Sequence, residues 1–523
     1  MPITEMLARN RRMYPEKTAL VEREPASGGR REITWLEFDR ITNRFANFLI
    51  TGGVQPEDRV VILLTNCLEW LPVYFGVLRT GALAVPLNFR FTADEIKKCM
   101  KVADAKMLIY GPEFIERIEE ILPEFQDKTR LIFIGENRPS VAEDYEQLLA
   151  AQPDDYPDVV VNDSDLAAIY FTSGTTGNPK PILLNHHNLV SACITENRHH
   201  LLTHNDNFLC IPPLYHTGAK MHWFGNLIVG AKAVILRGVS PKWVLEAVSE
   251  EQATVVWLLV PWAQDILDAI EDGEVNLKDY RLDQWWLMHI GAQPVPPSLI
   301  NRWLEVFPDH KYDTNYGLSE STGPGCVHLG LENIHKVGAI GRPGFNWETK
   351  IVDEDGNQVE RGTVGELLVR GPSVMQGYYK NPEDTAAVLK DGWLYTGDMA
   401  QEDEDGFIYL VDRKKDVVIC GGENIYPVEV EDFLQAHPDI KDVAVIGMPD
   451  TRLGEIPLAI IEVKHGRELS QEQVMEFCHQ LPRYKRPRLF RFGDVPRNPT
   501  GKIEKPLLRE IYCGQSEVLT KHK

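Results

Sequence analysis

Apolar runs with the length and residue types of strands alternate with helix-like segments through the first four hundred residues. Residues 58–66 (DRVVILLTN) precede the helix-like segment 67–81, and residues 232–238 (KAVILRG) precede segment 240–252, which opens on a serine typical of a helix N-cap. Strands that alternate with helices pack as mostly parallel sheets with helices on both faces. The pattern therefore predicts an α/β fold with doubly wound sheets.

The pattern of predicted elements changes after about Lys336. Residues 347–371 hold short strand-like runs separated by Asp-Gly and Arg-Gly turns, which is typical of a β-rich subdomain. A charged stretch (DRKKD) then precedes a C-terminal part with an α+β pattern. We expect a large unit over residues 1–412, a hinge at 413–416 and a small unit over 417–523, although such a charge run is also typical of a solvated turn.

The net charge of −22 over 523 residues argues against a general nucleic-acid-binding protein, because neutralising phosphates needs a basic face. The eight cysteines are scattered without a C-x-x-C pair, which favours free thiols in a reducing compartment. The histidine pairs at 186–187 and 199–200 have no carboxylate or cysteine at ligand spacing, so we expect no metal cage there. Neither a signal core nor a membrane-spanning run is found, so we expect a cytoplasmic protein with no transmembrane segment.

A loop rich in glycine and hydroxyl side chains follows an apolar run at residues 170–188 (YFTSGTTGNPKPILLNHHN). Its candidate phosphate-binding residues are Thr172, Ser173, Gly174, Thr175, Thr176, Gly177 and Lys180. Small residues let backbone N–H groups approach an anion closely, and a lysine adds a point charge. The spacing differs from the Walker A loop. The stretch therefore indicates a phosphate site of another kind, or an ordinary turn between two elements.

Further polar motifs follow along the chain. The motif NYGLSES contains Tyr316, Ser319 and Glu320, YTGD ends in Asp398, and PRNPTGKIEK presents Lys502. Together these motifs supply a phosphate cradle, a flat aromatic ring, carboxylates and a lysine. Such groups can hold MgATP and stabilise charge that moves between its phosphates.

These motifs, in this order and at this spacing, resemble those of the AMP-forming acyl-CoA synthetases of the adenylate-forming superfamily. The superfamily also includes acetyl- and aryl-CoA ligases, luciferases and peptide-synthetase adenylation domains. The resemblance covers essentially the whole chain. It implies a large N-terminal adenylation domain, made of doubly wound sheets and a β-rich subdomain, and a small mobile α+β C-terminal domain. The implied reaction uses ATP, Mg²⁺ and coenzyme A to convert a carboxylic acid to acyl-AMP and then to acyl-CoA.

The resemblance also implies roles for the nucleotide-binding residues. The loop from Thr172 to Lys180 wraps the β- and γ-phosphates, Tyr316 stacks on adenine, and Ser319 reaches the α-phosphate. Glu320, with Thr175, holds Mg²⁺. The remaining implied contacts are Gly291, Ala292, Gln293, Asn315 and Gly317 around adenine, and Asp398 and Arg413 at the ribose. Outside this set, Tyr316 reads as a packed core residue and Asp398 as a turn cap.

The sequence departs from the family pattern at Ser319, where the family commonly has Thr, and at three further positions. Pro181 and Asn185 follow the phosphate loop where the family usually has Gly and Ser or Thr, and Ile290 replaces the first glycine of the adenine block. Proline cannot donate an N–H, so one donor is missing at the exit of the loop. Because the phosphate-holding donors lie earlier, we expect little loss.

In the C-terminal part, the resemblance implies that Lys502 contacts both the carboxylate and the α-phosphate during adenylation. Lys415 stands at the hinge, and rotation about it would withdraw Lys502 and present another face to CoA. Gly421 and Gly422 on that face would let the pantetheine arm pass close to the backbone. The basic run 483–491 is either a contact for the CoA phosphates or a solvated patch.

The stretch IPPLYHTGAKMHWFG lies where the family builds its acyl pocket. The candidate pocket residues are Tyr215, Trp223, Trp257 and Ile290, with His216 between the pocket and the reacting carboxylate. No acidic residue stands between Tyr215 and Gly225 to pair with an ammonium group, which argues against an amino-acid substrate. The aromatic residues favour a compact apolar acid that is cyclic, aromatic or of short to medium chain, although core tryptophans and histidines look the same in a sequence.

Two other functions remain open at this point. The enzyme could stop at the adenylate or deliver it to a carrier-protein thiol, or the chain could be a nucleotide-binding homologue without catalysis. Retention of Glu320, Asp398, Arg413 and Lys502 weighs against the last reading. The sequence leaves the oligomeric state open, a homodimer included.

Overall fold

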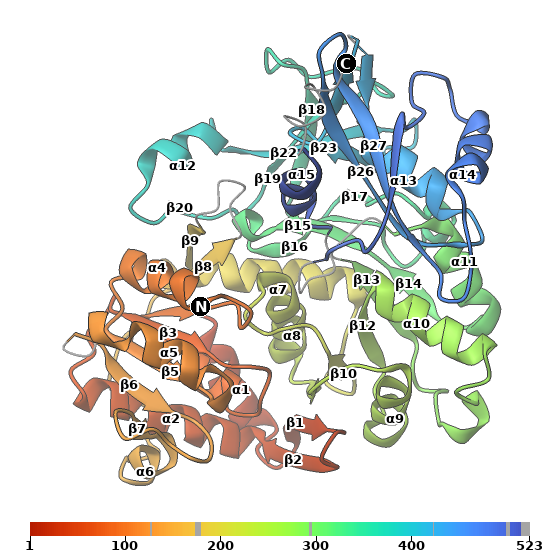
Figure 1. The fold of residues 1–523 in the computed structure, drawn as a ribbon. Helices are drawn as coiled ribbons and strands as arrows, with labels where there is room; N and C mark the ends of the chain where they lie inside the picture. Colours follow the sequence, from red (N-terminus) through yellow and green to blue (C-terminus); the bar gives the residue numbers. More distant parts are fainter. Residues whose placement is uncertain (126–127, 173–178, 292–294, 422, 498–502, 514–523) are drawn as a thin grey trace.

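The computed structural model describes residues 1–523 except 126–127, 173–178, 292–294, 422, 498–502 and 514–523 (Figure 1). The described residues form five sheets. Two large sheets occupy the first part of the chain, two smaller ones follow, and a fifth belongs to the C-terminal part. Figure 1 shows the C-terminal strands in blue at the opposite end of the molecule from the N-terminal helices in red and orange.

The two large sheets are mostly parallel, as the alternating pattern predicts. The eight-stranded sheet has the order β20 (Gly377–Tyr378), β9 (Lys180–Asn185), β8 (Leu166–Thr172), β4 (Leu83–Pro86), β3 (Arg59–Leu63), β5 (Met107–Tyr110), β6 (Arg130–Phe133) and β7 (Glu143–Asp144). The seven-stranded sheet has the order β14 (Lys311–Asp313), β13 (Leu287–Gly291), β12 (Val255–Leu259), β10 (Asn207–Cys210), β11 (Lys232–Leu236), β1 (Thr18–Glu24) and β2 (Gly29–Thr34). Antiparallel pairing is confined to the strand pairs β8–β9, β9–β20 and β1–β2 within these sheets, among the described residues.

Helices cover both large sheets, and several begin at residues that suit a helix start. The helices of the first part are α1 (Thr4–Met13), α2 (Trp35–Thr51), α3 (Trp70–Arg79), α4 (Ala93–Ala103), α5 (Ile115–Ile121), α6 (Tyr145–Ala150), α7 (His186–His200), α8 (Thr217–Val229), α9 (Pro241–Glu251), α10 (Val260–Glu271) and α11 (Pro297–Val306). The expected cap of α9 is present, because the Ser240 side chain accepts the Trp243 N–H. Asn185, a departure from the family pattern, caps α7 through a reciprocal pair with Asn188.

The region from Asn315 to Arg413 is β-rich, and it includes the part after Lys336 where short strands are expected. A three-stranded sheet has the order β15 (Asn315–Leu318), β16 (Gly323–His328) and β17 (Arg342–Pro343), and the one-turn 3₁₀ helix η4 (Ser319–Ser321) joins β15 to β16. The next sheet contains β18 (Glu348–Val352), β19 (Gly365–Arg370), β22 (Trp393–Glu402) and β21 (Leu389–Lys390), with β23 (Ile408–Arg413) paired to β22, and α12 (Pro382–Val388) precedes β21.

The C-terminal part is a separate α+β unit. Its sheet contains β25 (Glu423–Ile425), β24 (Val418–Cys420), β27 (Gly454–Val463) and β26 (Ile440–Asp450), with β28 (Leu489–Phe492) paired to β27. Its helices are α13 (Pro427–Gln435), α14 (Gln471–Phe477) and α15 (Lys505–Cys513). The predicted fold class, an α/β protein with a large N-terminal part, a β-rich subdomain and a small α+β part, is confirmed.

The largest core lies where α2, α3, α7 and α8 pack between the two large sheets. It includes Phe38, Phe75, Trp223 and Phe224. A second core lies on the other face of the seven-stranded sheet, under α9, α10 and α11, and includes Ile290. None of the helices in the described part of the chain is both long and apolar enough to cross a bilayer.

Candidate nucleotide and acyl site

The nucleotide motifs meet through Asp398 on β22. The Tyr316 hydroxyl, from β15, donates a hydrogen bond to Asp398 Oδ2, and Arg413 Nε, from β23, lies 2.6 Å from Asp398 Oδ1. The antiparallel pairing of β22 and β23 places Asp398 directly opposite Arg413. Burial works against the charged guanidinium, but the Asp398 carboxylate raises the pKa of Arg413 on balance. Strands β15, β22 and β23 therefore bring Tyr316, Asp398 and Arg413 together, although these residues lie far apart in the sequence.

The turn after Tyr316 is tightly packed. A Cβ at Gly317 would lie 2.0 Å from the Gly323 carbonyl oxygen, so only glycine fits where β15 passes β16. Ser319 follows in η4, and the Thr217 hydroxyl at the start of α8 donates to Ser319 Oγ over 3.1 Å. This hydrogen bond joins the expected α-phosphate contact to the segment that carries the expected acyl pocket.

Glu320 and Lys180 are linked through Tyr378 on β20. The Tyr378 hydroxyl donates to Glu320 Oε1 over 2.9 Å, and Lys180 Nζ lies 5.0 Å from the centre of the Tyr378 ring. Lys180 also forms an ion pair with Asp384, with 3.1 Å between Nζ and Oδ2. The carboxylate proposed for a metal ion is therefore oriented by a neighbouring hydroxyl.

Several expected contacts lie outside the described residues. They are Ser173, Gly174, Thr175, Thr176, Gly177, Ala292, Gln293, Gly422 and Lys502. The structure does place the residues beside them. Thr172 at the end of β8 pairs with Lys180 at the start of β9, and Gly291 ends β13.

The acyl side of the site begins at His216, the N-cap residue of α8. A Cβ added to Gly218 would lie 3.1 Å from His216 Nδ1 and 3.3 Å from the Trp257 ring, so the histidine, the glycine and the tryptophan are packed together. The Tyr215 ring stands edge-on to Phe89 with 5.4 Å between ring centres, and burial raises the pKa of its hydroxyl. His216 and Trp257 therefore lie on either side of Gly218, and Tyr215 precedes His216 in the sequence.

Two expected pocket residues face elsewhere. Trp223 is 1% exposed and packs between the aromatic rings of Phe38, Phe75 and Phe224. Ile290 lies in the second core, because side chains alternate along β13 and its neighbours His289 and Gly291 take the opposite face. Both side chains therefore pack in apolar cores, and their assignment to the substrate pocket stays a prediction that this packing does not support. Whether a large apolar side chain on α8 or β13 can reach the proposed acyl pocket depends on which face of its helix or strand it occupies.

A group of buried polar residues beside Trp257 was missed by sequence reasoning. This histidine–carboxylate cluster consists of Glu196 and His200 on α7, His222 on α8, His289 on β13, Asp313 on β14 and His328 on β16, each 4% exposed or less. The His222 ring lies 4.4 Å from the Trp257 ring, measured between centres. Asn315 also points here, since its side-chain amide donates to Glu196 Oε1 over 2.6 Å.

The charges in this cluster are closely coupled. Burial, together with neighbouring histidines, lowers the pKa of His222 and of His289 well below the usual range. Burial alone would lower the pKa of His328, but the Glu196 and Asp313 carboxylates beside it raise that pKa to about 10. The sequence reading that no carboxylate stands at ligand spacing from the histidine pairs was wrong, because Glu196 and His200 are one helical turn apart and face each other.

A short turn connects the β-rich sheet to the C-terminal unit. Between β23 and β24 the Asp416 N–H donates to the Arg413 carbonyl over 2.8 Å, and Lys415 is exposed in this turn. Asp412 is buried, and its Oδ2 accepts the Val428 N–H of α13 over 3.0 Å. Burial raises the pKa of Asp412 to about 6. One hydrogen bond thus connects the last strand before the turn to the first helix after it.

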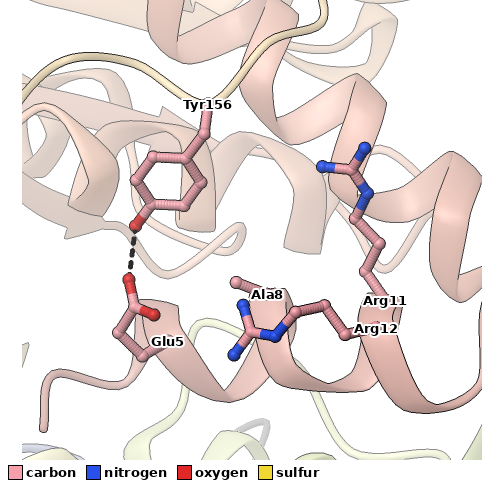
Figure 2. Close-up of a pocket in the computed structure, with 5 residues that line it drawn as sticks. All are labelled: Glu5, Ala8, Arg11, Arg12 and Tyr156. Carbon is pink, nitrogen blue, oxygen red and sulfur yellow. Dashed lines mark hydrogen bonds between the residues drawn. The ribbon is translucent and has the colours of Figure 1, made fainter.

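Gly421, expected on the CoA face, directly follows β24. Its N–H donates to the Leu453 carbonyl over 2.7 Å. The surface pocket in Figure 2 lies away from all these residues. It is lined by α1 residues and Tyr156, whose hydroxyl donates to Glu5 Oε1 over 2.9 Å. The site described above is therefore defined by its hydrogen bonds and packing rather than by this hollow.

Comparison with known proteins identifies the family. The AMP-binding enzyme model matches residues 7–379, and the model of the AMP-binding enzyme C-terminal domain matches residues 429–502. Feruloyl-CoA synthase of Amycolatopsis sp is 33% identical, with 96% of this chain and 98% of that protein covered. Long-chain-fatty-acid–CoA ligase FadD13 of Mycobacterium tuberculosis is 30% identical, with 97% and 98% covered.

A solved structure agrees with these matches. The crystal structure of the anthranilate CoA ligase AuaEII in complex with anthranoyl-AMP has a TM-score of 0.90 at 26% identity, with 99% of this chain and 98% of that chain covered. The chain therefore belongs to the AMP-binding enzyme family and is an AMP-forming acyl- or aryl-CoA ligase.

Proposed function

We propose that this ligase joins CoA to a compact carboxylic acid, either cyclic, aromatic or of short to medium chain, in two steps. First, a carboxylate oxygen attacks the α-phosphorus of ATP, the bond from that phosphorus to the oxygen bridging the β-phosphate breaks, and pyrophosphate leaves. Second, the CoA thiol loses its proton and attacks the acyl carbon, and AMP leaves with the former carboxylate oxygen. Acid, ATP and CoA are consumed, and acyl-CoA, AMP and pyrophosphate are formed.

The hydrogen bond between Thr217 and Ser319 is the observation that carries this proposal. It ties the start of α8, which bears His216, to the turn that follows Tyr316. An acid held beside His216 would therefore lie next to a nucleotide held by Tyr316, Ser319 and Asp398. Adenylation requires this proximity, because the carboxylate must reach the α-phosphorus.

Magnesium fits the residues around Glu320. The Glu320 side chain is partly exposed, and the Tyr378 hydroxyl donates a hydrogen bond to one of its carboxylate oxygens. Carboxylate oxygens are hard ligands, which Mg²⁺ prefers. We propose that Glu320, with Thr175, holds the magnesium ion of MgATP, which would neutralise phosphate charge. The loop from Thr172 to Lys180 would hold the β- and γ-phosphates through its backbone N–H groups.

The C-terminal unit would supply Lys502 for adenylation and a second face for CoA. We propose that residues 413–416 act as the hinge between units spanning residues 1–412 and 417–523. Support comes from the exposed turn at Lys415 and from the Asp412–Val428 hydrogen bond across it. Rotation there would exchange Lys502 for the segment at Gly421 and Gly422.

The relatives are named for ferulic, long-chain fatty and anthranilic acids, so their names do not single out one kind of acid. Our proposal for the acid therefore rests on the residues beside His216. Trp257 lies within 3.3 Å of the position that a Cβ of Gly218 would take, so a bulky ring stands beside His216, where we propose that the carboxylate binds. With Trp223 and Ile290 in the cores, Tyr215, His216 and Trp257 remain as wall residues. A short wall of this kind supports a compact acid.

The experiment is a panel of straight-chain, alicyclic and aromatic acids in a coupled AMP-release assay, run with and without CoA. We expect CoA-dependent AMP release and an acyl-CoA product with compact acids. Adenylate formation without a CoA thioester would point instead to delivery to a carrier-protein thiol. Absence of pyrophosphate release with every acid would indicate a catalytically silent homologue.

A further inference from the structure

The histidine–carboxylate cluster has no role in either half-reaction described above. Its six side chains come from five different elements, and all are buried. Burying a polar group costs free energy unless the group finds a partner. Among the described residues, five atoms in the cluster make no hydrogen bond: Glu196 Oε2, His222 Nε2, both ring nitrogens of His289, and His328 Nε2.

Three atoms of the cluster converge on one point. Glu196 Oε2 lies 3.3 Å from His222 Nδ1 and 3.6 Å from His200 Nδ1, and the three residues each offer one ligand atom within 4.8 Å of the other two. A tetrahedral zinc ion with bonds of about 2.0–2.1 Å holds its ligand atoms about 3.3–3.4 Å apart. The carboxylate oxygen accepts no hydrogen bond from either nitrogen, although both are close to it. The two oxygen–nitrogen distances are close to the spacing of ligands around such an ion.

The same ligands are oriented from outside, as in metal centres. His200 donates from Nε2 to Asp313 Oδ2 over 2.9 Å, which leaves the Nδ1 lone pair directed at Glu196 and His222. Asn315 donates to Glu196 Oε1 over 2.6 Å, which leaves Oε2 for the converging point. A second carboxylate or amide that fixes a ligating histidine or carboxylate is a regular feature of metal sites.

A neighbouring set, His200, Asp313 and His328, has similar spacing but different bonding. Asp313 Oδ2 accepts from His200 and from His328 over 3.1 Å, and Asp313 Oδ1 accepts the Gly330 N–H over 3.0 Å. Both oxygens of Asp313 are therefore satisfied, whereas Glu196 Oε2 has no hydrogen-bond partner in the described structure. This difference selects the first set as the ligands and Asp313 as their support.

We propose that Glu196, His200 and His222 bind one transition-metal ion of the zinc type. Two imidazole nitrogens and one carboxylate oxygen suit Zn²⁺, whereas Mg²⁺ prefers oxygen ligands alone, so this ion is distinct from the one that ATP brings. The fourth position falls to a water molecule or to His289, whose ring centre lies 4.3 Å from that of His222. The ion would connect α7 to α8 directly behind Trp257 and so hold the wall of the acyl pocket.

The test measures the metal content of the full chain. The protein is produced without a polyhistidine tag in zinc-supplemented medium, dialysed against metal-free buffer without chelator, and analysed by mass spectrometry of the elements. We expect about one zinc per chain. His222→Asn and Glu196→Gln should each lower the zinc content at least about fivefold. The matched control is His186→Asn, because His186 is also a buried α7 histidine with two unpartnered nitrogens in the described structure but lies outside the cluster.

A second measurement needs no variant. The wild-type protein is stripped of metal and titrated with Co²⁺, for which tetrahedral coordination gives strong visible absorption and octahedral coordination gives only weak absorption. We expect strong absorption that saturates at about one equivalent and is reversed by Zn²⁺. Wild-type protein with less than about 0.1 zinc and only weak cobalt absorption would overturn the proposal. Unchanged zinc in both variants would also overturn it, and if a variant does not fold, the cobalt spectrum of the wild type decides.

Discussion

The Tyr316 hydroxyl donates a hydrogen bond to the Asp398 carboxylate, which also forms a 2.6 Å ion pair with Arg413. The aromatic residue expected under adenine and the acid expected at the ribose are thus one hydrogen-bonded unit. If both contact the nucleotide, a change at the hydroxyl should be felt in ATP binding even though the ring is kept.

Tyr316→Phe tests this unit. A hydrogen bond to a charged group contributes about 1.5–3 kcal/mol, so its loss should raise the KM for ATP by roughly tenfold or more. We expect the KM for the acid to change little, because the hydroxyl bonds to Asp398 and not to a residue of the proposed acyl pocket. Tyr409→Phe on β23 is the control. Equal increases in both KM values would show that the hydroxyl supports the fold and not the nucleotide site.

The Lys502 assignment predicts a division between the half-reactions. Lys502→Ala should lower the formation of acyl-AMP from acid and ATP by about 10²–10³-fold, the usual scale for removing one group that stabilises charge in the transition state. The variant should still convert supplied acyl-AMP and CoA to thioester. Lys464→Ala, which removes an exposed lysine of the same unit, is the control. An equal loss in both half-reactions would remove Lys502 from its proposed role.

The packing around His216 predicts different effects for two small changes. Gly218→Ala would place a methyl group 3.1 Å from His216 Nδ1 and 3.3 Å from Trp257, and crowding of this kind costs about 1–3 kcal/mol. We expect kcat/KM for ring acids to fall tenfold or more at a temperature where the variant is still folded, as checked by its Tm. Ile290→Ala should instead lower the free energy of unfolding by about 2–5 kcal/mol and leave the rank order of acids unchanged. A change in rank order in Ile290→Ala would return that residue to the pocket.

The different positions of Ile290, Trp223 and Trp257 in the structure show what the sequence could and could not predict. The alternating apolar runs and the Ser240 cap are local features, and the sheets and helices they predict are confirmed. The motifs around Tyr316 and Asp398 were found because their residue types and order are distinctive. Which tryptophan faces the acid depends on which face of a strand or helix meets a neighbouring element, and neither composition nor spacing contains that information.

The histidine–carboxylate cluster was missed for two separate reasons. The pair Glu196 and His200 is local, since residues four apart share a helix face, and attention to that spacing would have found it. His222, Asp313 and His328 join it only through the packing of α7, α8, β14 and β16, so no sequence pattern connects them.

Backbone rotation at the proposed hinge predicts the effect of a proline. Lys415 occupies the third position of the turn closed by the hydrogen bond from Asp416 to Arg413. Proline fixes φ near −65°, so Lys415→Pro should restrict rotation and lower thioester formation much more than adenylation. Because proline is unfavourable at this position of common turns, thermal stability is measured alongside. Lys415→Ala should retain both half-reactions. A proline variant with both half-reactions intact would show that rotation occurs elsewhere.

The buried Asp412 carboxylate makes the stability of the protein depend on pH. Its two oxygens accept the N–H groups of Arg413 and Val428, yet burial raises its pKa from the ordinary 3.8 to about 6. Because the folded protein then holds the proton more tightly than the unfolded chain, this group contributes stability below pH 4 that is lost as the pH rises to about 6. One pKa unit corresponds to about 1.4 kcal/mol, so the full loss is about 3 kcal/mol.

Asp412→Asn cannot titrate and gives up one of the two hydrogen bonds, which adds a constant cost. Urea midpoints of both proteins are measured across this pH range, and we expect the variant to gain stability relative to the wild type as the pH rises. Parallel curves for the two proteins would mean that Asp412 does not carry this pH dependence.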